Sequence, residues 1–135
     1  MLTSAGFEDM DGKQKSNIVD CFYKILDKPA SDAKVLFIPT AAVNNEAKEM
    51  ADWCRGELIH IGILPENITT YDIGGSLYED DAMTYDVIYF TGGDTRYLLE
   101  RIKETGFDII VKKMIYMNKV YVGVSAGSII ATPNI

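Results

Sequence analysis

The sequence predicts an α/β fold in which helices cover both faces of a mostly parallel sheet. Apolar runs typical of buried strands alternate with segments whose apolar residues recur at helical spacing. Strands and helices that alternate in this way form parallel sheets. The chain has 135 residues and neither an internal repeat nor a break in composition, so residues 1–135 are expected to form a single domain.

Three strands and two helices are expected in the first half of the chain. Residues 1–4 look like the end of a strand, residues 35–38 form a continuous apolar run, and residues 68–73 form a more polar third strand. The first helix is expected to begin near Ser16 or Asn17. The apolar stripes of the two helices are Ile18, Cys21, Phe22, Ile25 and Leu26 in the first, and Ala47, Met50, Ala51, Cys54, Leu58 and Ile61 in the second.

The second half is expected to add two strands and two helices. Their bounds follow from capping side chains and from glycines that end helices. In order, the expected elements are a loop over acidic residues 79–81, a strand at 87–90, a helix capped by Asp94 or Thr95 and closed by Gly106, a short helix around 109–117, and a strand at 120–124.

The last of these strands runs into Gly123-Val124-Ser125-Ala126-Gly127, which has the G-x-S-x-G spacing of a nucleophile elbow. An elbow holds one serine at a sharp turn from strand to helix, and its glycines let the two elements approach closely. Ser125 would then lie above the carboxyl end of the sheet, with the Ala126 N–H facing a developing negative charge. The five residues alone fit an ordinary turn of small residues equally well.

Two more turns, residues 39–42 and residues 91–95, are expected at the same edge of the sheet, where ligands bind in open α/β folds. The N–H groups of Gly92 and Gly93 are the natural source of a second oxyanion donor. The same pair fits a plain tight turn. A phosphate-binding turn is a third interpretation, although neither phosphate-loop nor dinucleotide-binding motif is present.

Composition argues against several kinds of partner. Thirteen Lys and Arg against twenty Asp and Glu give a formal net charge of −7 without a basic run, so nucleic acid and membranes are poor partners. Cys21 and Cys54 are expected to be small core residues and not metal ligands or a disulfide pair. Cysteines without a disulfide fit a reducing compartment. No signal peptide and no apolar run long enough to span a bilayer is present, so we expect a cytoplasmic protein, without cofactor or metal.

Three segments together resemble the hallmark segments of the peptidase E family, the S51 serine peptidases, which also include the cyanophycinases. They are residues 37–41, 89–99 and 123–135, in the order of the family and over essentially the whole chain. The resemblance implies a flavodoxin-like, three-layer fold like that of class I glutamine amidotransferases. It also implies a dipeptidase that cleaves small peptides after an N-terminal aspartate or at a related β-aspartyl linkage.

Carried over residue by residue, the resemblance implies that Ser125 is the nucleophile. It also implies that the backbone amides of Gly93 and Ala126, with Gly92 adjacent, form the oxyanion hole. Asp94 stands where many peptidase E sequences have asparagine and where cyanophycinases have aspartate, so it bears on the choice of substrate.

The family's catalytic histidine and carboxylate follow the nucleophile, and this sequence ends ten residues after Ser125. The only histidine, His60, is expected at the opposite edge of the sheet. We therefore expect that the C-terminal part of the domain is missing and that the 135-residue chain lacks triad-level activity. The alternative is a non-catalytic homologue that binds a ligand or a partner. Apolar sheet surface left open would favour a homodimer or self-association.

Overall fold

A computed structural model describes residues 2–3, 16–75 and 77–124, and a five-stranded sheet forms the centre of these parts. The strands are β1 (Leu2–Thr3), β2 (Val35–Ile38), β3 (Ile68–Thr70), β4 (Val87–Phe90) and β5 (Val120–Val124). Their order in the sheet is β1-β5-β4-β2-β3, and all four pairs are parallel. The inner strands β2 and β4 are buried at every residue, as their continuous apolar sequences require.

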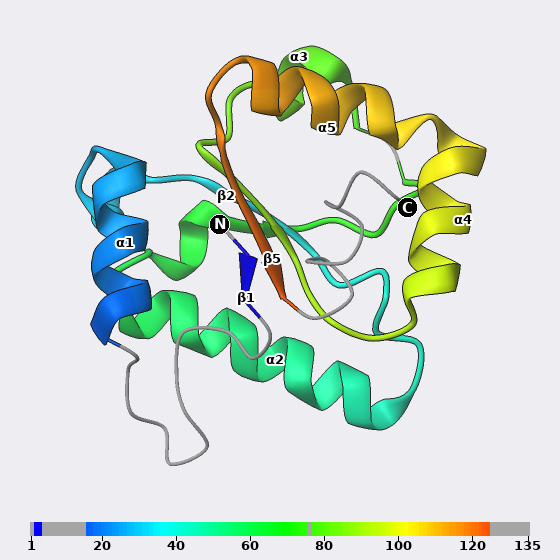
Figure 1. The fold of residues 1–135 in the computed structure, drawn as a ribbon, viewed down its shortest axis with the longest axis horizontal. Coiled ribbons are helices and arrows are strands. Elements are labelled where there is room, and N and C mark those ends of the chain that lie inside the picture. The colour runs from blue at the N-terminus through cyan, green and yellow to red at the C-terminus, as the bar shows by residue number, and fades with distance from the viewer. Residues whose placement is uncertain (1, 4–15, 76, 125–135) are drawn as a thin grey trace.

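Helices cover both faces of this sheet. They are α1 (Ser16–Leu26), α2 (Asn45–His60), α3 (Glu79–Ala82), α4 (Thr95–Thr105) and α5 (Phe107–Tyr116). Figure 1 shows α2 on one side of the strands and α3 and α5 on the other. Side chains of α1 and α2 pack into one core cluster and those of α3, α4 and α5 into a second. The expected three-layer α/β architecture is therefore confirmed, and none of the described helices has the length and apolar composition that crossing a membrane requires.

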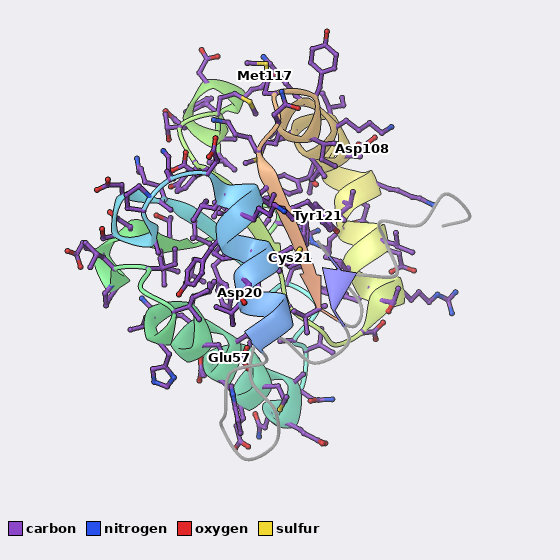
Figure 2. The ribbon with its side chains drawn as sticks, turned by 60° about the vertical axis from the view of Figure 1, so that its left-hand side comes forward. Asp20, Cys21, Glu57, Asp108, Met117 and Tyr121 are labelled. Atoms are coloured by element: carbon purple, nitrogen blue, oxygen red, sulfur yellow. The ribbon has the colours of Figure 1, made fainter. Side chains whose placement is uncertain are left out.

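The buried stripe of α1 differs from the expected one. Phe22 and Leu26 are buried as expected, and Val19 joins them. Ile25 is exposed, and so is Cys21 on α1 (Figure 2). Spacings of three and four residues place Val19, Phe22 and Leu26 on one narrow face, which leaves Cys21 beside it. The prediction that both cysteines are core residues is thus correct for Cys54 and wrong for Cys21.

Three other elements also differ from expectation. Met50 is exposed on α2 instead of facing the core. β3 ends at Thr70, because the chain then leaves the sheet and the N–H of Ile73 donates to the Thr40 hydroxyl. Acidic residues 79–81 open α3 instead of forming a loop, since carboxylates in a first helical turn interact favourably with the helix dipole.

The strand order creates a reversal in the middle of the sheet. From β2, the chain goes to β3 on one side, and the later strands β4 and β5 lie on the other side of β2. In open α/β sheets, ligands bind at the carboxyl ends of the strands where the strand order reverses in this way. The turns after β2 and β4 meet at this place and define the candidate site.

Candidate active site

The turns after β2 and β4 are joined backbone to backbone. The Asp94 N–H donates to the Ala41 carbonyl oxygen over 2.8 Å, and Gly93 has a φ of +142°. A Cβ atom on Gly93 would lie 2.5 Å from the Ala41 carbonyl carbon and 3.0 Å from the Ala42 nitrogen. Since real Cβ atoms do not approach backbone so closely, both the conformation and the contact require glycine here.

The two glycines of this turn present unpaired backbone donors. Within the described part of the chain, neither the Gly92 N–H nor the Gly93 N–H donates a hydrogen bond. Gly92 is half-buried and Gly93 is exposed, next to the N-terminus of α4. Unpaired N–H groups at the start of a helix favour negative charge, so this turn can bind an oxyanion.

The end of β5 opens into the same cavity as these glycines. Gly92, Gly93 and Val124 line a cavity of about 490 Å³, with Met50 and Cys54 of α2 also in its lining. Parallel pairing of Phe90 with Gly123 sets β5 beside β4 up to this edge. Ser125, Ala126 and Gly127 follow Val124 directly and lie outside the described residues.

A larger cavity of about 770 Å³ adjoins the first and shares Asp94 with it. Asp52, Asp72 and Asp94 bring three carboxylates to its lining, and Lys48 brings one ammonium group. The Asp94 Oδ1 accepts the Tyr97 N–H over 3.0 Å, so Asp94, and not Thr95, is the N-cap of α4. This bond fixes the direction of the Asp94 side chain at the boundary of the two cavities.

Asp72 is a site residue that the sequence reasoning missed. The Thr40 hydroxyl donates to its Oδ1 over 2.9 Å and accepts the Ile73 N–H over 3.0 Å. Arg101 donates to the Ile73 carbonyl over 2.9 Å, which fixes the same loop from the side of α4. No local pattern could have revealed Asp72, because the pairing of β2 with β3 brings it to Thr40.

Cys54 is the nucleophilic side chain in the lining of the smaller cavity, and it is unsuited to attack. Burial raises the pKa of its thiol to about 11, although a hydrogen bond with the Tyr89 hydroxyl acts in the opposite direction. Glu57, one turn along α2 (Figure 2), adds to the rise in pKa. A thiol with this pKa is protonated at neutral pH, and only the thiolate is an effective nucleophile.

His60 does not join the candidate site. It is exposed and is the last residue of α2, whose first residue Asn45 lies at the edge with the cavities. In a helix of this length, His60 lies about 22 Å from Asn45 along the helix axis. In the described ranges, no group of three or more His, Cys, Asp or Glu side chains is arranged to hold a metal ion.

Two curated relatives place the chain among the peptidases. An uncharacterized peptidase of Listeria monocytogenes is 37% identical over 103 residues, which cover 75% of this chain and 49% of that protein. An uncharacterized peptidase of Pasteurella multocida is 30% identical over 122 residues, which cover 89% of this chain and 59% of the relative. The chain thus spans about half the length of the curated relatives it matches.

Solved structures show the same fold. The crystal structure of a Listeria monocytogenes protein, described as a candidate peptidase E, matches with a TM-score of 0.73 at 28% identity. The match covers 98% of this chain and 61% of that protein. A peptidase from an acI-B1 actinobacterium matches in fold alone, with a TM-score of 0.50 at 20% identity over 93% of this chain and 54% of that one. The family model for peptidase family S51 matches residues 1–135, and this chain therefore belongs to that family.

Proposed function

We propose that the chain carries the nucleophile and the oxyanion hole of a serine-type peptidase, with Ser125 as the nucleophile. The observation that carries this proposal is the shared cavity at the carboxyl edge of the sheet. Gly92 and Gly93, whose N–H groups find no acceptor among the described residues, and Val124 at the end of β5, from which Ser125 follows, line one cavity. A nucleophile and its oxyanion donors must both lie within about 3 Å of the reacting carbonyl group.

The proposed reaction passes through an acyl-enzyme. The Ser125 Oγ attacks the scissile carbonyl carbon, and a general base removes the hydroxyl proton. The amides of Gly93 and Ala126, with Gly92 adjacent, stabilise the negative charge on the carbonyl oxygen. The C–N bond then breaks, the proton passes to the leaving amine, and water hydrolyses the ester that remains on Ser125.

The proposed substrates are short peptides with an N-terminal aspartate or a related β-aspartyl linkage, as in the peptidase E family. Asp94 bears on this choice, because its carboxylate lies between the two cavities and repels an acidic side chain placed there. Asparagine at this position would remove the charge and keep the cap of α4. Asp94→Asn is therefore expected to raise the preference for acidic over neutral peptides, measured as a ratio of kcat/KM values.

The 135-residue chain is proposed to turn over peptides slowly. A serine hydroxyl without a base is a weak nucleophile, and the one histidine in the sequence, His60, lies at the far end of α2. Loss of one triad member leaves only the orders-of-magnitude smaller catalysis of the oxyanion hole and of binding. The same position of His60 favours a second candidate function, a non-catalytic module that binds small peptides at this edge.

Hydrolysis of aspartyl dipeptides and of a chromogenic aspartyl anilide, with and without added imidazole as external base, tests the proposal. We expect slow turnover that imidazole increases in the parent chain but not in Ser125→Ala. Peptide binding by calorimetry without any turnover dependent on Ser125 would support the binding module instead. Fast turnover without imidazole that disappears in Ser125→Ala would support the serine mechanism and contradict the predicted low activity.

A further inference from the structure

Val43 and Met50 are apolar side chains that the core does not use. They are 47% and 51% exposed, and Met50 lies on α2 beside the buried Ala51. Single exposed apolar side chains are common on protein surfaces and need no explanation. These two differ because both line one cavity, the smaller of the two at the carboxyl edge of the sheet.

The first half of α2 presents different faces to the two cavities. Ala47, Met50 and Cys54 line the smaller cavity, and their spacing of three and four residues places them on one face of the helix. Lys48 and Asp52 line the larger cavity. The face of α2 toward the smaller cavity is therefore apolar, whereas the one toward the larger cavity is charged.

The smaller cavity also contains the candidate oxyanion donors. Gly92 and Gly93 line it together with Val43 and Met50, so a carbonyl group bound at the two glycines shares its space with an apolar wall. The cavity volume of about 490 Å³ lies within the range of small-molecule sites, about 300–1,000 Å³. A substrate side chain next to the reacting carbonyl can therefore reach this wall.

The charged groups of the smaller cavity restrict which side chain suits it. Its polar lining consists of the carboxylates of Glu46 and Asp94, the carboxamide of Asn44 and the two glycines. The Asn44 Oδ1 is already used, because it accepts the Ala47 N–H over 2.8 Å. The two carboxylates repel an acidic side chain, and a basic one finds more carboxylates in the larger cavity. An apolar side chain is the kind that gains from contact with the α2 wall.

We propose that Val43, Ala47 and Met50 form the subsite for an apolar side chain on the residue that follows the scissile bond. The subsite rests on the proposed function, in which the residue before this bond is aspartate. It narrows the substrates to aspartyl peptides whose second residue is apolar. Met50 is then a specificity-determining residue, because its side chain touches the substrate.

Two peptides of similar shape and different polarity test the subsite: aspartyl-leucine amide and aspartyl-asparagine amide. Amides are used because Glu46 and Asp94 repel a terminal carboxylate. Dissociation constants are measured by calorimetry with Ser125→Ala, which prevents turnover, and kcat/KM values with the parent chain and imidazole. We expect the leucine peptide to be preferred by about tenfold or more, the range for small differences in an apolar pocket. Aspartyl-lysine amide reports on the larger cavity.

Met50→Gln makes the wall polar at nearly the same size, whereas Met50→Leu keeps it apolar, and all three residues are good helix formers. We expect Met50→Gln to lower the preference for leucine by about fivefold or more and Met50→Leu to retain it. Trp53→Gln is the matched control, because Trp53 is 43% exposed on the same helix and lines neither cavity. The unfolding midpoint is measured in parallel, and Val43→Thr replaces Met50→Gln if the latter does not fold.

The outcomes separate the subsite from the proposed function. Equal values for the leucine and asparagine peptides, with turnover that still depends on Ser125, would overturn the subsite alone. A preference for leucine that Met50→Gln leaves unchanged, or that Trp53→Gln lowers as much, would also overturn it. Preference for the lysine peptide would assign the second residue to the larger cavity and contradict the subsite. If no peptide binds and no turnover depends on Ser125, the proposed function fails and the subsite fails with it.

Discussion

The two ends of β4 are held to their neighbours in different ways. At the amino end, the Asp86 carboxylate accepts hydrogen bonds of 2.9 Å from the Lys28 ammonium group and from the Lys34 N–H. At the carboxyl end, the backbone of Gly93 lies directly against the backbone of Ala41. The side-chain hydrogen bonds at the amino end leave room for substitutions, whereas the close backbone contact at Gly93 leaves no room for a side chain. The comparison indicates that the amino end supplies stability and that the carboxyl end is shaped to keep N–H donors open.

Gly93→Ala is expected to give the largest loss of stability. The added Cβ meets the Ala41 carbonyl group and the backbone has a φ that L side chains rarely adopt, so the free energy of unfolding should fall by about 2–4 kcal/mol. Chemical denaturation measures the loss. Gly56→Ala is the matched control, because nothing lies near a Cβ there and a helical alanine should stabilise by about 0.5–1 kcal/mol. Equal effects of the two substitutions would contradict the close contact at Gly93.

Asp86→Asn tests the amino end and should have a smaller effect. Its side chain is 21% exposed and its two bonds are charge-assisted, so their weakening should cost about 1–2 kcal/mol of unfolding free energy. Glu100→Gln is the control, since the pair of Glu100 with Arg96 is 58% and 90% exposed and should change stability by less than about 0.5 kcal/mol. A loss at Asp86 no greater than that at Glu100 would refute the stabilising role of the amino end.

Acid should remove the contribution of Asp86. Burial acts to raise the pKa of Asp86, but the hydrogen bonds from Lys28 and from the Lys34 amide outweigh it, and the pKa lies below the ordinary 3.8. The group therefore stabilises the fold above the unfolded-state pKa of about 3.9, and this stabilisation is lost as the pH falls through the lower folded-state value. The difference in unfolding free energy between parent and Asp86→Asn should be constant near neutral pH and shrink below about pH 4. A pH-independent difference would exclude the carboxylate charge as its cause.

Asp94→Asn should have the smallest effect on stability at the carboxyl end. Asparagine caps helices as well as aspartate does, so the unfolding free energy should change by less than about 0.5 kcal/mol. Asp94→Ala, which loses the bond to the Tyr97 N–H, should cost about 1 kcal/mol. If Asp94→Asn is as destabilising as Asp94→Ala, the charge of Asp94 serves the fold and not the choice of substrate.

Local pattern predicted β2, β4 and the ends of α4 well, because each depends on nearby residues. The buried runs of β2 and β4 could be predicted because both faces of a central parallel strand are apolar. The cap of α4 by Asp94 and its end at Gly106, with a φ of +71°, follow from the same local chemistry. The exposure of Cys21 and Met50 could not be predicted, because helical spacing does not tell how wide a stripe the sheet will cover.

The candidate site could be predicted only in part, because much of it comes from contacts between distant segments. The sequence singled out Gly92 and Gly93, but the requirement for glycine at Gly93 arises from Ala41 on a neighbouring turn. Asp72 reaches the site through the pairing of β2 with β3. These contacts depend on the order of the strands in the sheet, which could not be predicted from the sequence.

The pairing of β1 with β5 sets an order of assembly. Leu2 pairs with Gly123, so almost all of the 135 residues lie between these two partners. Contacts between such distant segments form slowly, because the chain must close a long loop first. Earlier segments of a chain leave the ribosome first, so β1 can pair with β5 only after residues 120–124 have emerged. The strand that leads to Ser125 is thus joined to its outer neighbour late, only after all the segments between the two strands have been made.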